Sequence, residues 1–144
     1  MTARRTFVVI EDGTEYIQRF RRFLGESFDF VPAADFVAAR AAAAGSDGLL
    51  LDLDFRRTPA ERLIDERGQP AAALDAGTRL RLAETQGILI LRRLRAEAVA
   101  LPAVLFADLD DRQAEFLRRT LAPLSIAPSR LGLREIADLL RAAK

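Results

Sequence analysis

Short apolar runs alternate with amphipathic stretches along the whole chain. Apolar runs bounded by turn residues predict buried strands at residues 6–10, 28–31, 48–53, 103–106 and 124–126. Apolar side chains at helical spacing predict helices at residues 16–24, 33–44, 87–98, 110–121 and 132–143. This alternation predicts an α/β fold with one doubly wound parallel sheet, right-handed crossovers and helices on both faces. The uninterrupted apolar strands agree with burial on both sides.

One connection is much longer than the others. Residues 55–86, here called the inserted segment, separate the third strand from the third helix, whereas such connections usually take about 2–6 residues. We expect a helical turn or two at residues 60–67 and a short strand at residues 78–83, where Arg alternates with Leu. No part of the sheet pattern lies inside this segment, which predicts that the core folds without it. Its exit from the third strand places it over the carboxyl edge of the sheet, with a variable surface loop as the alternative.

Acidic residues follow two of the predicted strands. Glu11 and Asp12 come directly after the first strand, and Asp52 and Asp54 come at the end of the third. Ligands of open α/β sheets bind outside the carboxyl ends of the strands, so these four side chains are predicted to share one pocket. Carboxylates gathered in this way repel each other. They need a bound cation, an Arg or Lys, or a raised pKa, and each of these answers indicates a different function.

Composition removes several classes of chemistry. The 144 residues are the size of one domain, and the sequence contains no cysteine and no histidine. Disulfides, thiolate nucleophiles and zinc sites built on sulfur or imidazole are therefore excluded. The only lysine is Lys144, the last residue, and the net charge of +1 argues against a nucleic-acid surface. No apolar run approaches the roughly 20 residues of a membrane span, and no signal-peptide stretch precedes the first strand, so we expect a cytoplasmic protein.

The order and spacing of these pieces resemble the receiver domain of bacterial response regulators, the CheY-like domains of two-component signalling. The resemblance covers nearly the whole chain except the inserted segment. It rests on Glu11-Asp12 and on residues 46–52 (SDGLLLD), 87–95 (GILILRRLR) and 101–106 (LPAVLF). It implies a flavodoxin-like sheet with strand order 2-1-3-4-5, and Asp52 as the equivalent of the phospho-accepting aspartate. It also implies a magnesium site made by Glu11, Asp12 and Asp52, completed by the backbone carbonyl of Asp54.

Three positions depart from the pattern of that family. The Ser or Thr at the end of the fourth strand falls on Ala107, the Lys before a proline falls on Ala127, and the aromatic residue that reports phosphorylation falls on Leu124. The resemblance therefore implies a degenerate receiver, or pseudo-receiver, without phosphorylation-driven switching. As an alternative, an arginine takes over the role of the lysine, the candidates being Arg130, Arg56 and Arg57.

These observations lead to three hypotheses about function. The first is a non-enzymatic signalling module, one that binds other signalling proteins, such as a histidine kinase, or a second copy of itself. The resemblance places its interaction face on the fourth helix, fifth strand and fifth helix, at Arg112, Glu115, Arg119, Arg134 and Arg141. The second is a single-domain response regulator in a phosphorelay, phosphorylated at Asp52.

The third hypothesis is a magnesium-dependent phosphodiester enzyme. Glu11 together with Asp52-Leu53-Asp54 resembles the acidic residues of the Toprim domain. Only these residues carry that resemblance, and a nearly neutral chain is poorly suited to holding DNA.

Overall fold

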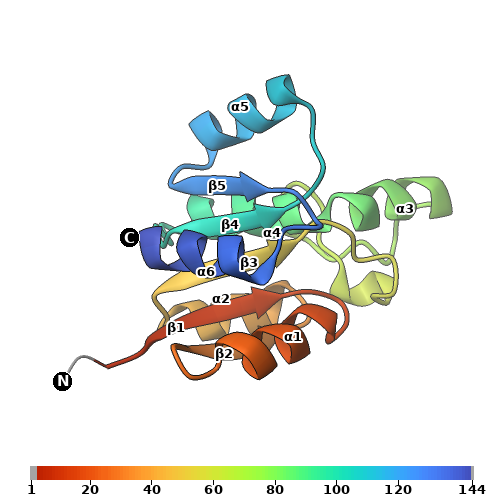
Figure 1. Ribbon diagram of the computed structural model, residues 1–144. Helices are drawn as coiled ribbons and strands as arrows, with labels where there is room; N and C mark the ends of the chain where they lie inside the picture. The colour runs from red at the N-terminus through yellow and green to blue at the C-terminus, as the bar shows by residue number, and fades with distance from the viewer. Residues whose placement is uncertain (1–2, 144) are drawn as a thin grey trace.

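A computed structural model describes residues 3–143 of the chain. Its parallel sheet has five strands in the order β2-β1-β3-β4-β5 (Figure 1), which confirms the predicted fold class and strand order. The strands are β1 (Arg5–Ile10), β2 (Phe28–Ala33), β3 (Gly48–Asp52), β4 (Ala103–Phe106) and β5 (Leu124–Ala127). The sheet is parallel throughout, so all five strands end at one carboxyl edge.

Helices cover both faces of the sheet, as predicted. The helices are α1 (Glu15–Leu24), α2 (Phe36–Ala43), α3 (Ala76–Glu84), α4 (Gln86–Ala96), α5 (Asp111–Thr120) and α6 (Leu133–Ala142). Alternate residues of each strand enter two separate apolar clusters. Val8 and Leu49 belong to the cluster under α2, α4 and α5, whereas Val9 and Leu50 belong to the cluster under α1 and α6. Both faces of the sheet are therefore buried, which explains the continuous apolar strands.

Aspartates start three of these helices. Asp35, Asp75 and Asp110 each accept a hydrogen bond from the backbone N–H three residues later, at 2.8–2.9 Å. A side-chain acceptor at this position stabilises a helix start, because the first N–H groups have no partner within the helix. None of the helices within residues 3–143 is long and apolar enough to cross a membrane.

The inserted segment differs from its sequence-based description. The strand predicted at residues 78–83 is wrong, because these residues lie in helix α3, which Asp75 caps. The turns predicted at residues 60–67 reduce to one 3-10 turn, Ala60–Arg62, followed by an isolated antiparallel bridge between Ile64 and Pro70. Figure 1 shows the segment, coloured yellow to green, at the end of the sheet to which the strands point.

The inserted segment also contributes to the main apolar cluster. Phe55, Leu63, Ile64, Ala71 and Leu82 are at most 7% exposed and belong to the cluster under α2, α4 and α5. The sequence pattern indicated no core position in this segment, and packing corrects that interpretation. Removing the segment would expose the cluster, so we now expect the core to depend on it.

Gln86, the first residue of α4, joins the inserted segment to the core. Its side chain is 1% exposed and accepts from the Ile64 N–H at 2.8 Å. It also donates to the carbonyl oxygens of Ile64 at 3.0 Å and Leu82 at 3.2 Å. A single buried amide thus pairs three backbone groups of the inserted segment.

We expect Gln86→Leu to lower the free energy of unfolding by about 2–4 kcal/mol, because it leaves the buried N–H and C=O of Ile64 without partners. Urea unfolding followed by circular dichroism measures the loss. Gln113→Leu, at an exposed position of α5, is the matched control and should change little. Equal stability of the two variants would contradict the role assigned to Gln86.

Candidate functional site

Acidic side chains from β1 and β3 meet at the carboxyl edge of the sheet. Asp12 follows β1, Asp52 is the last residue of β3, and Asp54 comes two residues later. Together with Arg56 and Arg57 they line a pocket of about 330 Å³. The structure therefore brings together three of the four predicted carboxylates, and adds two arginines from the inserted segment.

Helix α4 begins very close to this pocket. The Gly87 N–H donates to the carbonyl oxygen of Leu53 at 3.0 Å, and a Cβ at Gly87 would overlap the carbonyl oxygen of Asp52. Only glycine allows this approach of the two backbones. The start of α4 thus fixes the backbone that carries Asp52.

Glu11 has a different role from the one predicted. It is 3% exposed, and its carboxylate accepts from the backbone N–H groups of Tyr16 at 3.1 Å and Ile17 at 2.9 Å. These N–H groups belong to the first turn of α1, where a carboxylate is favourable. Burial is the largest cause of a pKa raised above its ordinary value. Glu11 therefore caps a helix and does not line the pocket.

Asp12 is held by Arg57. Its side chain is 4% exposed, and Oδ1 lies 3.0 Å from one terminal guanidinium nitrogen of Arg57. Oδ2 accepts from the backbone N–H of Arg57 at 3.0 Å and from its Nε at 3.4 Å. The same guanidinium donates to both carboxylate oxygens of Glu15, at 2.8 and 3.1 Å. This contact lowers the pKa of Glu15 to about 2.

Asp52 has no such partner. Within residues 3–143 it forms no ion pair, and Oδ1 accepts only from the adjacent Leu53 N–H at 2.9 Å. Burial, and then the negative charges of Asp12 and Asp54, raise its pKa to about 6. Asp54 is itself neutralised by Arg56, whose Nε lies 2.7 Å from Oδ2. Within residues 3–143, Asp12 and Asp54 each have a cationic partner in this pocket, whereas Asp52 has none. Burial and repulsion by its neighbours therefore appear as a raised pKa of Asp52.

This arrangement does not fit the magnesium ion that the sequence resemblance implies. Hard cations such as Mg²⁺ need several oxygen ligands around one point. In the described part of the chain, no group of three or more acidic side chains is placed to hold a metal ion. Glu11 is bound to α1, and both oxygens of Asp12 face Arg57. The ligand set of the Toprim hypothesis fails for the same reason, because Glu11 does not join Asp52 and Asp54 in the pocket.

Comparisons with known proteins identify the architecture. No protein-family model and no curated protein sequence matches the chain. Among solved structures, the receiver domain of Francisella response regulator 1452 is similar with a TM-score of 0.67, 13% identity, and coverage of 96% of this chain and 94% of that one. The chemotaxis protein CheY4 of Vibrio cholerae gives a TM-score of 0.68 at 11% identity, with coverage of 99% and 100%.

A third similar structure is the BeF3-activated receiver domain of Klebsiella pneumoniae RstA. It gives a TM-score of 0.64 at 20% identity, with coverage of 96% of this chain and 97% of that one. The chain has the receiver-domain fold. Identities this low show the fold and not the activity, so function must be argued from the residues.

The three positions at which the sequence departs from the family it resembles lie just after β4 and within β5. Ala107 and Ala127 are 5% and 2% exposed, and the Ala107 N–H donates to the carbonyl oxygen of Ala127 at 3.0 Å. Leu124, at the start of β5, packs against the main apolar cluster. Arg130, proposed above as a substitute for the lysine, forms no ion pair within residues 3–143. No cationic or hydroxyl side chain replaces these two alanines at their own positions.

A polar contact that the sequence analysis missed lies beside these alanines. Ser129 donates from its Oγ to Asp108 at 2.6 Å and from its backbone N–H at 3.2 Å. These hydrogen bonds lower the pKa of Asp108. They join the loop after β4 to the loop after β5. The only sequence signal was that each residue stands two positions beyond a strand end, next to Ala107 and next to Pro128.

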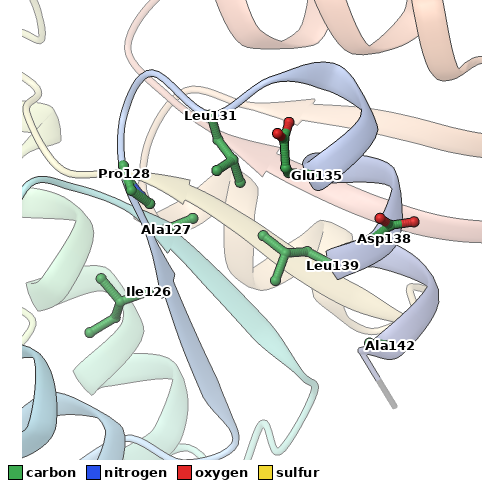
Figure 2. Close-up of a pocket in the computed structure, with 8 residues that line it drawn as sticks. All are labelled: Ile126, Ala127, Pro128, Leu131, Glu135, Asp138, Leu139 and Ala142. Carbon is green, nitrogen blue, oxygen red and sulfur yellow. The ribbon is translucent and has the colours of Figure 1, made fainter.

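The predicted interaction face is exposed on both sides of β5. Arg112, Glu115, Arg119, Arg134 and Arg141 are all exposed on α5 and α6. Between β5 and α6 lies a groove of about 410 Å³ (Figure 2), with apolar residues on its floor and Glu135 and Asp138 of α6 along one side. Ile126 of the edge strand also lines a second cavity toward α5.

We expect Asp52→Asn to stabilise the protein at neutral pH. In the folded state the pKa of Asp52 is raised to about 6 from an ordinary value of 3.8, so folding favours the protonated form. The stability that protonation supplies is present at about pH 4 and is lost as the pH rises through about 6. At pH 7–8 the free energy of unfolding of the variant should exceed that of wild type by about 1–3 kcal/mol.

Urea unfolding of both proteins across this pH range measures the difference, which should vanish near the lower end. Asp111→Asn, at an exposed position at the start of α5, is the control and should give no gain. A constant stability difference at every pH would contradict repulsion as the cause.

Proposed function

We propose that this protein is a receiver-like signalling module that acts by binding other proteins and is not switched by phosphorylation. The observation that carries the proposal is the pair of buried alanines, Ala107 and Ala127. In the family that the sequence resembles, a hydroxyl and an ammonium group stand at these positions. Hydrogen bonds of such groups contribute about 0.5–3 kcal/mol each. A phosphoryl group on Asp52 would lack both contacts here, and a ligand without differential contacts shifts no conformational equilibrium.

The module is proposed to be non-enzymatic. The chain contains no histidine and no cysteine, and three of the four acidic residues at the carboxyl edge, Glu11, Asp12 and Asp54, are occupied by α1, Arg57 and Arg56. These contacts leave no set of side chains arranged as nucleophile, base and metal ligands. Binding of a partner is then the activity that the surface supports.

One observation favours a second candidate, a single-domain response regulator phosphorylated at Asp52. This carboxylate forms no ion pair within residues 3–143 and lines a pocket of about 330 Å³. Access to the carboxylate is a requirement for phosphoryl transfer, but it supplies no stabilisation of the transferred group. Direct phosphorylation separates the two candidates.

Acetyl phosphate with magnesium is expected to leave the mass of most molecules unchanged, because Ala107 and Ala127 cannot stabilise the phosphoryl group. Intact-mass spectrometry at a pH that preserves acyl phosphates measures the outcome. Asp52→Asn is the control for other sites of modification. A stoichiometric gain of one phosphoryl group, lost in Asp52→Asn, would favour the response regulator and contradict the proposal.

For the partner, charge on the β5 face favours a second copy of the chain. Glu135 and Asp138 on α6 flank the groove, and Asp138 pairs only with Arg141, at 3.4 Å. Arg112 and Arg119 on α5 form no ion pair within residues 3–143. A two-fold axis through β5 would bring α5 of one copy opposite α6 of the other, so that basic and acidic side chains meet.

Sedimentation velocity over a concentration series is expected to show reversible dimers. Arg112→Glu with Arg119→Glu, and separately Glu135→Arg with Asp138→Arg, should each weaken self-association about tenfold through like charges. A mixture of the two double variants should recover dimers, because their faces are again complementary. Arg22→Glu on α1, away from this face, is the control. Monomers at all concentrations, or no recovery in the mixture, would exclude the second copy as partner.

A further inference from the structure

Arg57 has contacts that an exposed arginine rarely makes. Its guanidinium lies between two carboxylates and forms four hydrogen bonds of 2.8–3.4 Å with them, two to Asp12 and two to Glu15. Its own backbone N–H adds a fifth, to Oδ2 of Asp12 at 3.0 Å. Planar guanidinium groups bind carboxylates in this paired geometry better than any other side chain does.

The carboxylate that Arg57 binds is nearly buried. The Asp12 side chain is 4% exposed, whereas the Arg57 side chain is 60% exposed. A buried carboxylate without a partner is costly, because it has lost most of its hydration. Arg57 therefore acts as the cation for a charge that the fold has already placed inside the protein.

The ion pair lies directly against the backbone of Gly13. A Cβ at this position would overlap the ends of the Arg57 and Glu15 side chains. Both are exposed side chains that can shift, so the close contact places the ion pair at the end of β1 without fixing it there.

The inserted segment supplies the cations of this edge, and Arg57 occupies the oxygens of Asp12. Arg57 binds Asp12 and Glu15, and Arg56 binds Asp54 at 2.7 Å, so the inserted segment delivers two positive charges to the carboxyl edge. A divalent cation would carry the same charge, but it would need the oxygens that Arg57 already occupies.

We propose that Arg57 is a permanent internal replacement for a divalent cation at the carboxyl edge of this sheet. The tethered guanidinium is present at all times and cannot be removed by a chelator. Asp12 therefore keeps a cationic partner at all times, and the inserted segment is the element that supplies it. This inference is independent of the proposed function, because it is tested without a partner or a phosphoryl donor.

Thermal melting with magnesium chloride tests the proposal, against sodium chloride of equal ionic strength. Wild type should melt at the same temperature in both salts. Arg57→Ala should melt about 5–10 °C lower, because Asp12 loses its cation. This variant should also gain a magnesium-dependent increase in melting temperature, because Mg²⁺ keeps several waters and needs only one or two carboxylates, here those freed by the loss of Arg57. Calorimetric titration should detect binding that wild type lacks. The double variant Arg57→Ala/Asp12→Asn should lose that gain.

Two further variants make the result specific to the guanidinium at this position. Arg56→Ala, in the same loop, should melt close to wild type and gain no response to magnesium, because its partner Asp54 is partly exposed. Arg57→Lys keeps the charge but loses the paired geometry, so it should melt between wild type and Arg57→Ala without binding magnesium.

Three results would overturn the proposal. A magnesium-dependent shift in wild type that disappears in Asp12→Asn would show that metal binds beside Arg57. An Arg57→Ala protein that melts like wild type would show that Asp12 needs no cation. An Arg57→Ala protein that gains no response to magnesium would show that the two cations are not equivalent. Should Arg57→Ala be unfolded without metal, circular dichroism decides: recovery of folding by magnesium supports the proposal, and no recovery contradicts it.

Discussion

Compensation of the carboxylates at the carboxyl edge of the sheet is the constraint on which the rest of this structure depends. Parallel strands end together, so β1 and β3 deliver their acidic residues to one place. Each carboxylate has a different environment. Backbone N–H groups of α1 bind Glu11, Arg57 binds Asp12, and Arg56 binds Asp54. Asp52 has a raised pKa instead. The groups that bind Glu11, Asp12 and Asp54 all belong to segments that follow β1 or β3 along the chain. Within residues 3–143, three of the four carboxylates are therefore paired by groups of the chain itself, whereas Asp52 has no cationic partner and carries the raised pKa.

The inserted segment both packs into the core and supplies the arginines that pair with Asp12 and Asp54. One part of it, with Ile64 and Leu82, is buried against α4 and held by the Gln86 side chain. Another part carries Arg57 to the end of β1. Because the buried part fixes the path of the chain, the guanidinium is restrained before it meets Asp12, and little side-chain entropy is lost in forming the ion pair.

The sheet and most helices were predictable from sequence, because burial on one or both faces leaves a local period in the apolar positions. Helix α3 was mistaken for a strand, since alternation of Arg with Leu over six residues fits both periods, and Asp75 as a helix cap was the better signal. The acidic positions were also predictable, because they follow strand ends. Their partners were not: the direction of Glu11 depends on where α1 begins, and the contact of Arg57 with Asp12 depends on the path of a long loop.

Polar side chains join the loops at both halves of the carboxyl edge. On the side of β1 and β3, Arg57 joins the inserted segment to Asp12. On the side of β4 and β5, Ser129 joins the two following loops through Asp108. In the family that the sequence resembles, a phosphoryl group would draw a hydroxyl and an ammonium group toward the acceptor at this second side. Here the loops are already joined by a side-chain contact, and alanines line the positions between them. The strand ends at β4 and β5 therefore carry alanines and a Ser129–Asp108 contact at the place where the resembled family has a hydroxyl and an ammonium group.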